Sequence, residues 1–116
     1  MDIIKLQTST YILRVHPEEL VCLHGDGNYT EMVLSNGYRK TLTLQLGKFY
    51  DILVTLRHTP FLRVGKSLVV NKDYVFYVEP GIQSLILSGQ GLVEPLPLTA
   101  SKEALRELKE LLGKEK

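Results

Sequence analysis

The chain has 116 residues, 44% hydrophobic and 23% charged, a balance typical of a globular protein that can bury one core. Its 14 lysines and arginines against 13 acidic residues leave a net charge of +1, so bulk charge indicates neither a nucleic-acid nor a membrane partner. No apolar run approaches the roughly 20 residues that span a bilayer, and the N-terminus carries no secretory signal. We therefore expect one cytoplasmic domain over residues 1–116.

Short strands are predicted for the first part of the chain, because alternating or clustered apolar residues are bounded there by turn residues. The expected strands are Tyr11 to Val15, Leu20 to Leu23, Tyr29 to Leu34 and Tyr38 to Leu42. The letters GDGN and SNG between them are typical of tight turns, which favour antiparallel pairing of successive strands.

The apolar period then changes from two to that of a helix. Helical spacing connects five apolar residues, Leu42, Leu46, Phe49, Leu53 and Leu56. We therefore expect a helix from Leu44 to Arg57 with one face on the sheet, ended by Pro60. Gly47 weakens this helix by up to about 1 kcal/mol relative to alanine without overruling the pattern.

Further strands and a second helix are predicted for the rest of the chain. The strands are Tyr74 to Val78, Ser84 to Ser88 and Leu92 to Leu98, separated by PG and GQG turns. A helix from Ser101 to Leu112 would be capped by Thr99 or Ser101 and would present the apolar edge Leu105, Leu108, Leu111 and Leu112. The expected fold class is mostly β, an antiparallel strand domain with two helices.

The stretch FLRVGKSLVVN, from Phe61 to Asn71, is apolar except for a basic, glycine-containing step. Gly65 lets the backbone bend out of the run, so Lys66 can reach outward before Leu68 to Val70 return to the core. A solvated surface crossing and a contact site both explain this pattern.

Catalytic and metal chemistry lack a matching motif. His16, Cys22, His24 and Asp26 fit no standard zinc spacing, and the single cysteine excludes an internal disulfide. No nucleophile motif or phosphate-binding loop is present, and GDGN lacks the further glycine of a dinucleotide loop. We expect no enzyme activity, no cofactor, no metal and no small-molecule substrate.

Polar and basic residues at separated turns suggest another kind of site. The candidates for nucleic-acid binding are Asn28, Tyr29, Arg39, Lys40, Lys66, Ser101 and Lys102. Each of them could equally be a solvated loop residue.

Three blocks in this order resemble the LytTR-type DNA-binding domain of bacterial response regulators: GDGNYTEMVLSNG, FLRVGKSLVVNKDYV and LPLTASKEALRELKELL. The middle block is the most specific, since Phe61, Arg63, Ser67, Val70 and Asn71 satisfy F-x-R-x-x-x-S-x-x-V-N. The resemblance spans roughly Glu19 to Leu112. It implies sequence-specific transcription control by a homodimer on repeated sites, with loops pressed into successive major grooves of bent duplex DNA.

Carried over position by position, the resemblance implies three contact regions. They fall at Tyr29 with Asn28, at Lys66, and around Ala100 to Lys102. Arg39, Lys40 and Lys102 would contact phosphates, while Arg63, Ser67 and Asn71 would support the contact loop.

This chain departs from the family at two contact positions. Gly65 stands where the family usually has a histidine, and Ala100 stands where an arginine is common. The alternative is a protein-interaction module of the same fold that has lost specific DNA reading.

Overall fold

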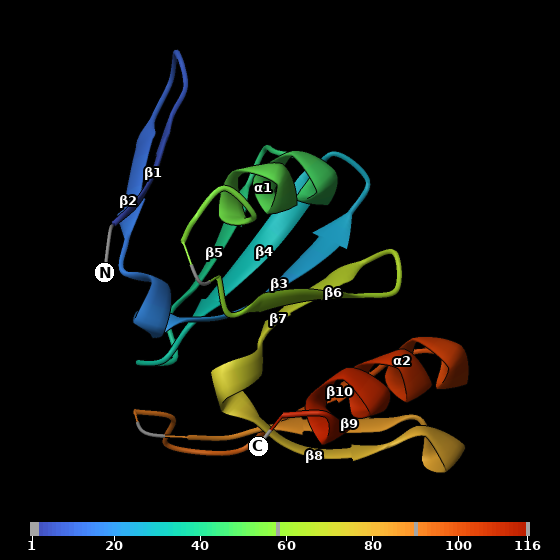
Figure 1. The fold of residues 1–116 in the computed structure, drawn as a ribbon. Coiled ribbons are helices and arrows are strands. Elements are labelled where there is room, and N and C mark those ends of the chain that lie inside the picture. The colour runs from blue at the N-terminus through green and yellow to red at the C-terminus, as the bar shows by residue number, and fades with distance from the viewer. Residues whose placement is uncertain (1–2, 58, 90, 116) are drawn as a thin grey trace.

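The computed structural model describes residues 3–57, 59–89 and 91–115 (Figure 1). The largest sheet consists of β3 (Leu20–Asp26), β4 (Tyr29–Leu34), β5 (Arg39–Leu42), β6 (Phe61–Val64) and β7 (Leu68–Asn71). Its strand order is β5-β4-β3-β7-β6, and every neighbouring pair is antiparallel. β3 and β7 therefore lie in its interior.

Two smaller sheets and two α-helices complete the described part of the chain. β1 (Ile4–Gln7) and β2 (Ile12–Val15) form a hairpin, while β8 (Val75–Glu79), β9 (Ser84–Leu87) and β10 (Leu96–Thr99) form a sheet of order β10-β9-β8. The helices are α1 (Leu46–Leu53) and α2 (Lys102–Gly113), and single 3-10 turns are η1 (Pro17–Glu19), η2 (Lys72–Tyr74) and η3 (Pro80–Ile82). Neither α-helix is long and apolar enough to cross a membrane.

Both faces of the five-stranded sheet are covered. Figure 1 shows α1 on one side, and α2 with the three-stranded sheet on the other. Successive residues of β7 point to opposite faces, so Val69 packs in the cluster around Phe49, whereas Leu68 and Val70 pack in the cluster around Leu105. The central strands are apolar without alternation because each face meets a core.

The predicted fold class is confirmed, and the predicted bounds of the first helix are wrong at both ends. α1 spans Leu46–Leu53 instead of Leu44 to Arg57. At its start, the buried hydroxyl of Thr30 donates to the Leu44 carbonyl (2.6 Å), which holds that residue in the approach to the helix. At its end, the amides of Thr55 and Leu56 bond carbonyls three residues back (3.2 Å each) instead of four, so the regular α-helical bonding does not continue to Arg57.

Other element boundaries also differ from the prediction. The prediction lacks β1, because its hairpin turn is TST, without glycine, proline or asparagine; Thr8 Oγ1 closes it by accepting from the Tyr11 amide (3.2 Å). β10 starts at Leu96 instead of Leu92, after a turn in which Gly91 has φ +94°. β8 starts after Tyr74, which belongs to η2.

The second helix starts and ends close to its predicted bounds, with Ser101 as its N-cap. The Ser101 hydroxyl accepts from the amide of Ala104 (3.1 Å). Leu105 and Leu108 are buried, but Leu111, expected on the apolar edge, is 53% exposed. The buried stripe passes from Leu108 to the partly buried Leu112, so Leu111 lies on its flank.

Gly25 is a point of tight packing between β3 and α1. A Cβ added at Gly25 would lie 2.7 Å from the Cβ of Leu46, which is not the movable end of a side chain. We expect Gly25→Ala to lower the free energy of unfolding by about 1–3 kcal/mol, because the helix must shift. Urea denaturation would measure this.

The matched control is Gly81→Ala, whose added Cβ meets nothing within 4 Å. It should change the free energy of unfolding by less than about 1 kcal/mol. Equal midpoints for Gly25→Ala and the parent protein would contradict the close packing of α1 on β3.

Candidate nucleic-acid interface

Two turns far apart in the sequence lie side by side at one end of the five-stranded sheet. β3 pairs with β7 so that His24 lies opposite Leu68, and one step further the amide of Gly25 donates to the Ser67 carbonyl (2.8 Å). This bond brings turn 27–28 of the β3-β4 hairpin beside turn 65–67 of the β6-β7 hairpin.

The start of α2 joins the same end of the sheet. A Cβ added at Gly65 would lie 3.6 Å from the Cβ of Ala104, an ordinary contact distance. We call the side of the domain formed by turn 27–28, turn 65–67 and residues 100–102 the turn edge. All three predicted contact regions thus have members on one side of the molecule (Figure 1).

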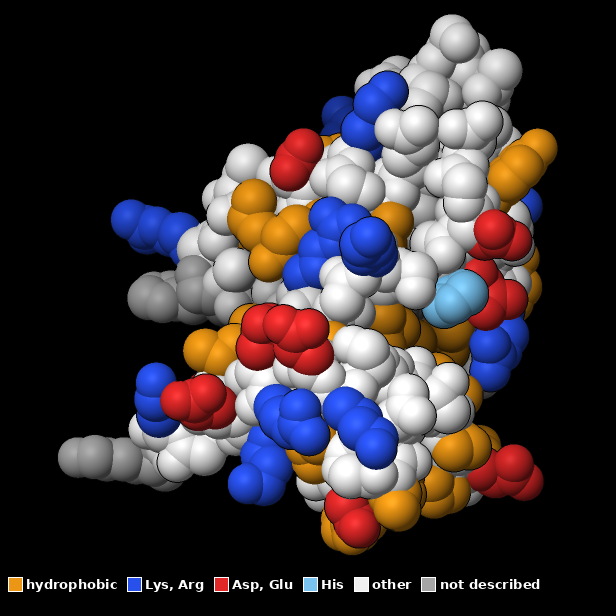
Figure 2. Space-filling view, turned by 90° about the vertical axis from the view of Figure 1, so that its right-hand side faces the viewer, with side chains coloured by type: hydrophobic (Ala, Val, Ile, Leu, Met, Phe, Trp, Pro, Cys, Tyr) orange, Lys and Arg blue, Asp and Glu red, His pale blue; other side chains and the backbone are white. Residues whose placement is uncertain are grey.

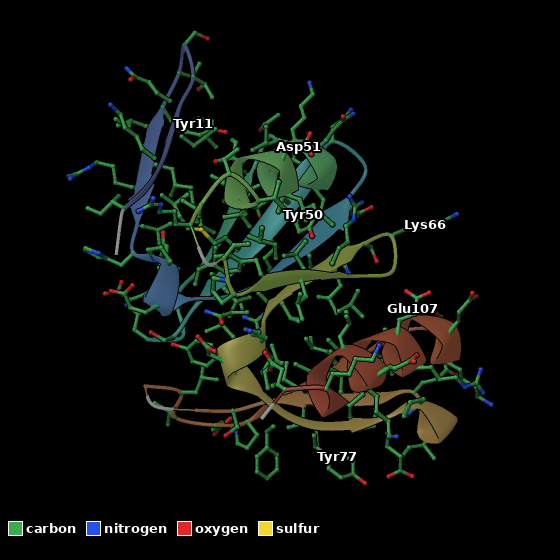
Figure 3. All side chains as sticks on the ribbon, in the orientation of Figure 1. Tyr11, Tyr50, Asp51, Lys66, Tyr77 and Glu107 are labelled. Atoms are coloured by element: carbon green, nitrogen blue, oxygen red, sulfur yellow. The ribbon has the colours of Figure 1, made fainter. Side chains whose placement is uncertain are left out.

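An open hollow separates turn 65–67 from α2. It has a volume of about 450 Å³ and is lined by Gly65, Lys66, Ser67, Ser101, Glu103, Ala104 and Glu107. We call it the contact hollow. Figure 3 shows Lys66 pointing outward from the hairpin tip and Glu107 on the side of α2 toward that hairpin.

Arg63 connects turn 65–67 to α1. Its Nη2 donates to the carbonyl of Lys66 (2.9 Å), which closes the turn from the side of β6. The guanidinium carbon also lies 5.9 Å from the centre of the Tyr50 ring, within the range of a cation–π contact. The position of Lys66 therefore depends on a side chain that bridges two elements.

Asn71 lies at the opposite end of β7 from that turn. It is fully buried, and its Nδ2 donates to the carbonyls of Leu20 (2.9 Å) and Pro17 (3.3 Å). Its Oδ1 accepts from the amide of Asp73 (3.0 Å) and so caps η2. These bonds tie η1 to η2. Ser67 reaches the neighbouring strand through its main-chain carbonyl, as described above.

The β3-β4 turn presents an aromatic ring and an amide. Tyr29, the first residue of β4, is 52% exposed and stands opposite Asp26. Asn28 Oδ1 accepts from Gln45 Nε2 (3.1 Å), a bond that joins the turn to the N-cap residue of α1. The β3-β4 hairpin that carries Tyr29 is thus hydrogen-bonded to Ser67 on one side and to Gln45 on the other.

Arg39 and Lys40 lie away from the turn edge. They belong to the edge strand β5, where Lys40 stands opposite Met32 and Arg39 opposite Val33, on the side of Leu42 that leads away from turn 27–28. Arg39 also forms an ion pair with Glu31 (3.1 Å). The structure therefore groups Asn28, Tyr29, Lys66, Ser101 and Lys102 and separates these two cations from them.

The turn edge carries charges of both signs. Figure 2, which views the molecule from this side, shows separate groups of basic and acidic side chains instead of a continuous basic band. In the described part of the chain the ion pairs between lysine or arginine and a carboxylate are Arg39 with Glu31 and Lys72 with Glu115. Neither pair includes Lys66, Glu103 or Glu107, the charged residues that line the contact hollow.

The residues considered for metal or nucleophilic chemistry do not form a centre. Among the described residues, no group of three His, Cys, Asp or Glu side chains could hold a metal ion. Cys22 is buried, and desolvation raises the pKa of its thiol to about 12, with Arg39 opposing and Glu31 adding to the shift. The thiol is therefore protonated at neutral pH and is part of the core.

A family model for the LytTr DNA-binding domain matches residues 10–113. The chain belongs to this family. The family resemblance inferred from the three sequence blocks is thereby confirmed.

A solved structure has the same fold. It is the LytTr DNA-binding domain of a Bacillus cereus protein described as a putative methyl-accepting/DNA response regulator, with a TM-score of 0.65 and 20% identity over 97% of this chain and 98% of that one. At this identity the likeness concerns the fold. No curated protein matches the chain.

The state of Cys22 can be tested by thiol labelling, since the chain has a single cysteine. Because burial disfavours the thiolate, a disulfide reagent at pH 8 should label the native protein at least ~100-fold more slowly than the protein unfolded in guanidinium chloride. Equal rates would contradict the burial, and Cys22→Ala is the blank.

The raised pKa of Cys22 also makes stability depend on pH. The folded state holds the Cys22 proton more tightly than the unfolded state, in which the thiol has its ordinary pKa of 9.0. This contribution to stability is complete below pH 9 and is lost as the pH rises toward 12. Cys22→Ala should remove that part of the alkaline loss of stability, which urea denaturation at a series of pH values would measure.

The bridge made by Arg63 predicts local loosening when its geometry changes. Arg63→Lys keeps the charge but loses the planar group that reaches both the Lys66 carbonyl and the Tyr50 ring. We expect amide exchange in turn 65–67 to rise about threefold to tenfold, while global stability falls by less than about 1 kcal/mol.

Arg14→Lys, a change at an exposed arginine of β2, is the matched control and should leave exchange in turn 65–67 unchanged. Unaltered exchange in Arg63→Lys would show that the turn holds its shape without the bridge. Hydrogen exchange read by NMR resolves the turn from the rest of the sheet.

Proposed function

We propose that this LytTr domain binds duplex DNA in a sequence-specific manner and regulates transcription, with the turn edge as its contact surface. The observation that carries the proposal is the bond between the Gly25 amide and the Ser67 carbonyl, which aligns two turns beside the start of α2. Side chains from such an edge can enter successive grooves of a duplex without a recognition helix.

Each residue at the turn edge has a distinct proposed role. Lys66 projects from its hairpin and can donate to guanine O6 or N7, or to a phosphate. Tyr29 offers an exposed ring and Asn28 an amide at the next turn. Ser101 and Lys102 offer a hydroxyl and an ammonium group where α2 begins, which suits a phosphate.

Arg39 and Lys40 have a conditional role in this proposal. They lie on β5, away from the turn edge, so a straight duplex on that edge would not reach them. Bending of the DNA toward β5 would bring its phosphates to these cations, at a deformation cost of order 1–6 kcal/mol. Their contribution thus depends on how far the target bends.

The remaining parts of the proposal follow from a DNA ligand. Two copies of the domain bind repeated sites as a homodimer, because repeated half-sites double the contacts of a small domain. The whole chain, residues 1–116, acts as one domain without catalysis, cofactor, metal or small-molecule substrate. Its place is the cytoplasm, where a bacterial chromosome lies.

A protein-interaction module is the second candidate, favoured by a different surface. Phe76 and Ile82 are 71% and 67% exposed, and Tyr77, which follows Phe76 in β8, points away from the body of the domain (Figure 3). The Tyr77 hydroxyl donates to the Glu79 carboxylate, which raises the pKa of the tyrosine. Exposed aromatic side chains along β8 suit a protein contact.

Lys66→Ala separates these candidates. Fluorescence anisotropy would measure binding to the duplex upstream of the protein's own gene and to a scrambled duplex, across a salt series. We expect the variant to bind the specific duplex roughly 5-fold to 100-fold more weakly, because one base-edge or phosphate contact is lost. Its melting temperature should stay within a few degrees, since the side chain is exposed.

The matched control is Lys5→Ala, on the β1-β2 hairpin away from the turn edge, which should bind like the parent protein. Salt-sensitive binding of equal strength to both duplexes would retain DNA association and reject sequence reading. Absence of binding to either duplex at low salt would favour the protein-interaction candidate.

A further inference from the structure

The contact hollow contains carboxylates where a purely phosphate-binding surface would carry only cations. Glu103 and Glu107 line it together with Lys66. Negative charges beside a duplex weaken the attraction of its phosphates. Their position at the turn edge therefore has a cost for DNA binding unless they make a contact of their own.

Glu103 has an explanation within the fold. It lies in the first turn of α2, where a carboxylate is stabilised by the positive end of the helix. Glu107 lies one turn further along, beyond that region. In the described part of the chain Glu107 takes part in none of the ion pairs, so its carboxylate is available to a ligand in the contact hollow.

The chemistry of the major groove offers that carboxylate a partner. In a G·C pair, guanine presents the acceptors O6 and N7, and cytosine presents the donor N4 beside them. Lys66 can only donate and an ionised Glu107 can only accept, so the two sides of the contact hollow match the two halves of this pair. Thymine places the acceptor O4 where cytosine has its amino group, and O4 repels a carboxylate.

We propose that Glu107 is a specificity-determining residue that accepts a hydrogen bond from a cytosine N4 amino group, while Lys66 contacts the guanine of the same or the adjacent pair. The inference rests on the proposed function and names the base that the contact hollow selects. It assigns base reading to the second turn of α2, beyond the turns that the family resemblance indicates.

The test is a binding selection from a randomised duplex pool with the parent protein, Glu107→Gln and Glu110→Gln. Glu110 is an exposed carboxylate of the same helix that does not line the contact hollow, so its variant has the same change of charge. The enriched site is then varied one base pair at a time, and affinities are measured by anisotropy at one salt concentration. Melting curves check that all proteins are folded.

We expect one cytosine in the parent's site to be preferred over thymine by about 5-fold or more. Glu107→Gln should lose that preference, because glutamine also carries donors and suits adenine, while Glu110→Gln should keep it. Glu107→Asp keeps the charge but shortens the side chain by one methylene, so it should reduce the cytosine preference. It checks that the result of Glu107→Gln does not come from new contacts made by the glutamine.

Two results would overturn this inference and leave the proposed function standing. One is an unchanged cytosine preference in Glu107→Gln. The other is a uniform gain in affinity for all duplexes, which would make Glu107 a repulsive charge without base reading. If the parent protein enriches no site at all, the proposed sequence reading fails first, and the inference fails with it.

Discussion

The antiparallel pairing of β3 with β7 is the constraint on which the rest of the domain depends. Both strands are covered on both faces, so a slip by one residue would exchange the side chains that meet α1 with those that meet α2. Burial thus fixes the register, and the register fixes the bond between the Gly25 amide and the Ser67 carbonyl. The turns are aligned because the core admits one pairing.

Two glycines show how closely the helices approach the turns from opposite sides. Gly25 leaves no room for a Cβ against Leu46, whereas Gly65 would place one at an ordinary distance from Ala104. What favours glycine at position 65 is its φ of +68°. A glycine at this position adds no side chain to the turn, and Lys66 is the group that projects from it (Figure 3).

The sequence is informative where structure is local and less so where distant segments meet. Alternation and turn residues predict most strands, and the block from Phe61 to Asn71 predicts the family. The hydrogen bond from Thr30 to the Leu44 carbonyl, which precedes the start of α1, joins segments that no local pattern connects. The same holds for the separation of Arg39 and Lys40 from the turn edge, which follows from strand register. The sequence places Glu107 only on an amphipathic helix, because its neighbour Lys66 is remote along the chain.

The near-neutral charge of the chain bears on how such a domain could hold DNA. Each phosphate contact adds to affinity and to its salt dependence, and the turn edge carries separate basic and acidic groups instead of a continuous basic band (Figure 2). A single copy would therefore gain little from phosphates alone. Linking two copies on repeated sites multiplies weak contacts, since the second binding event becomes intramolecular. Balanced charge is thus compatible with specific binding if base edges carry the discrimination and a homodimer supplies the affinity, which is the division of labour that the proposed function requires.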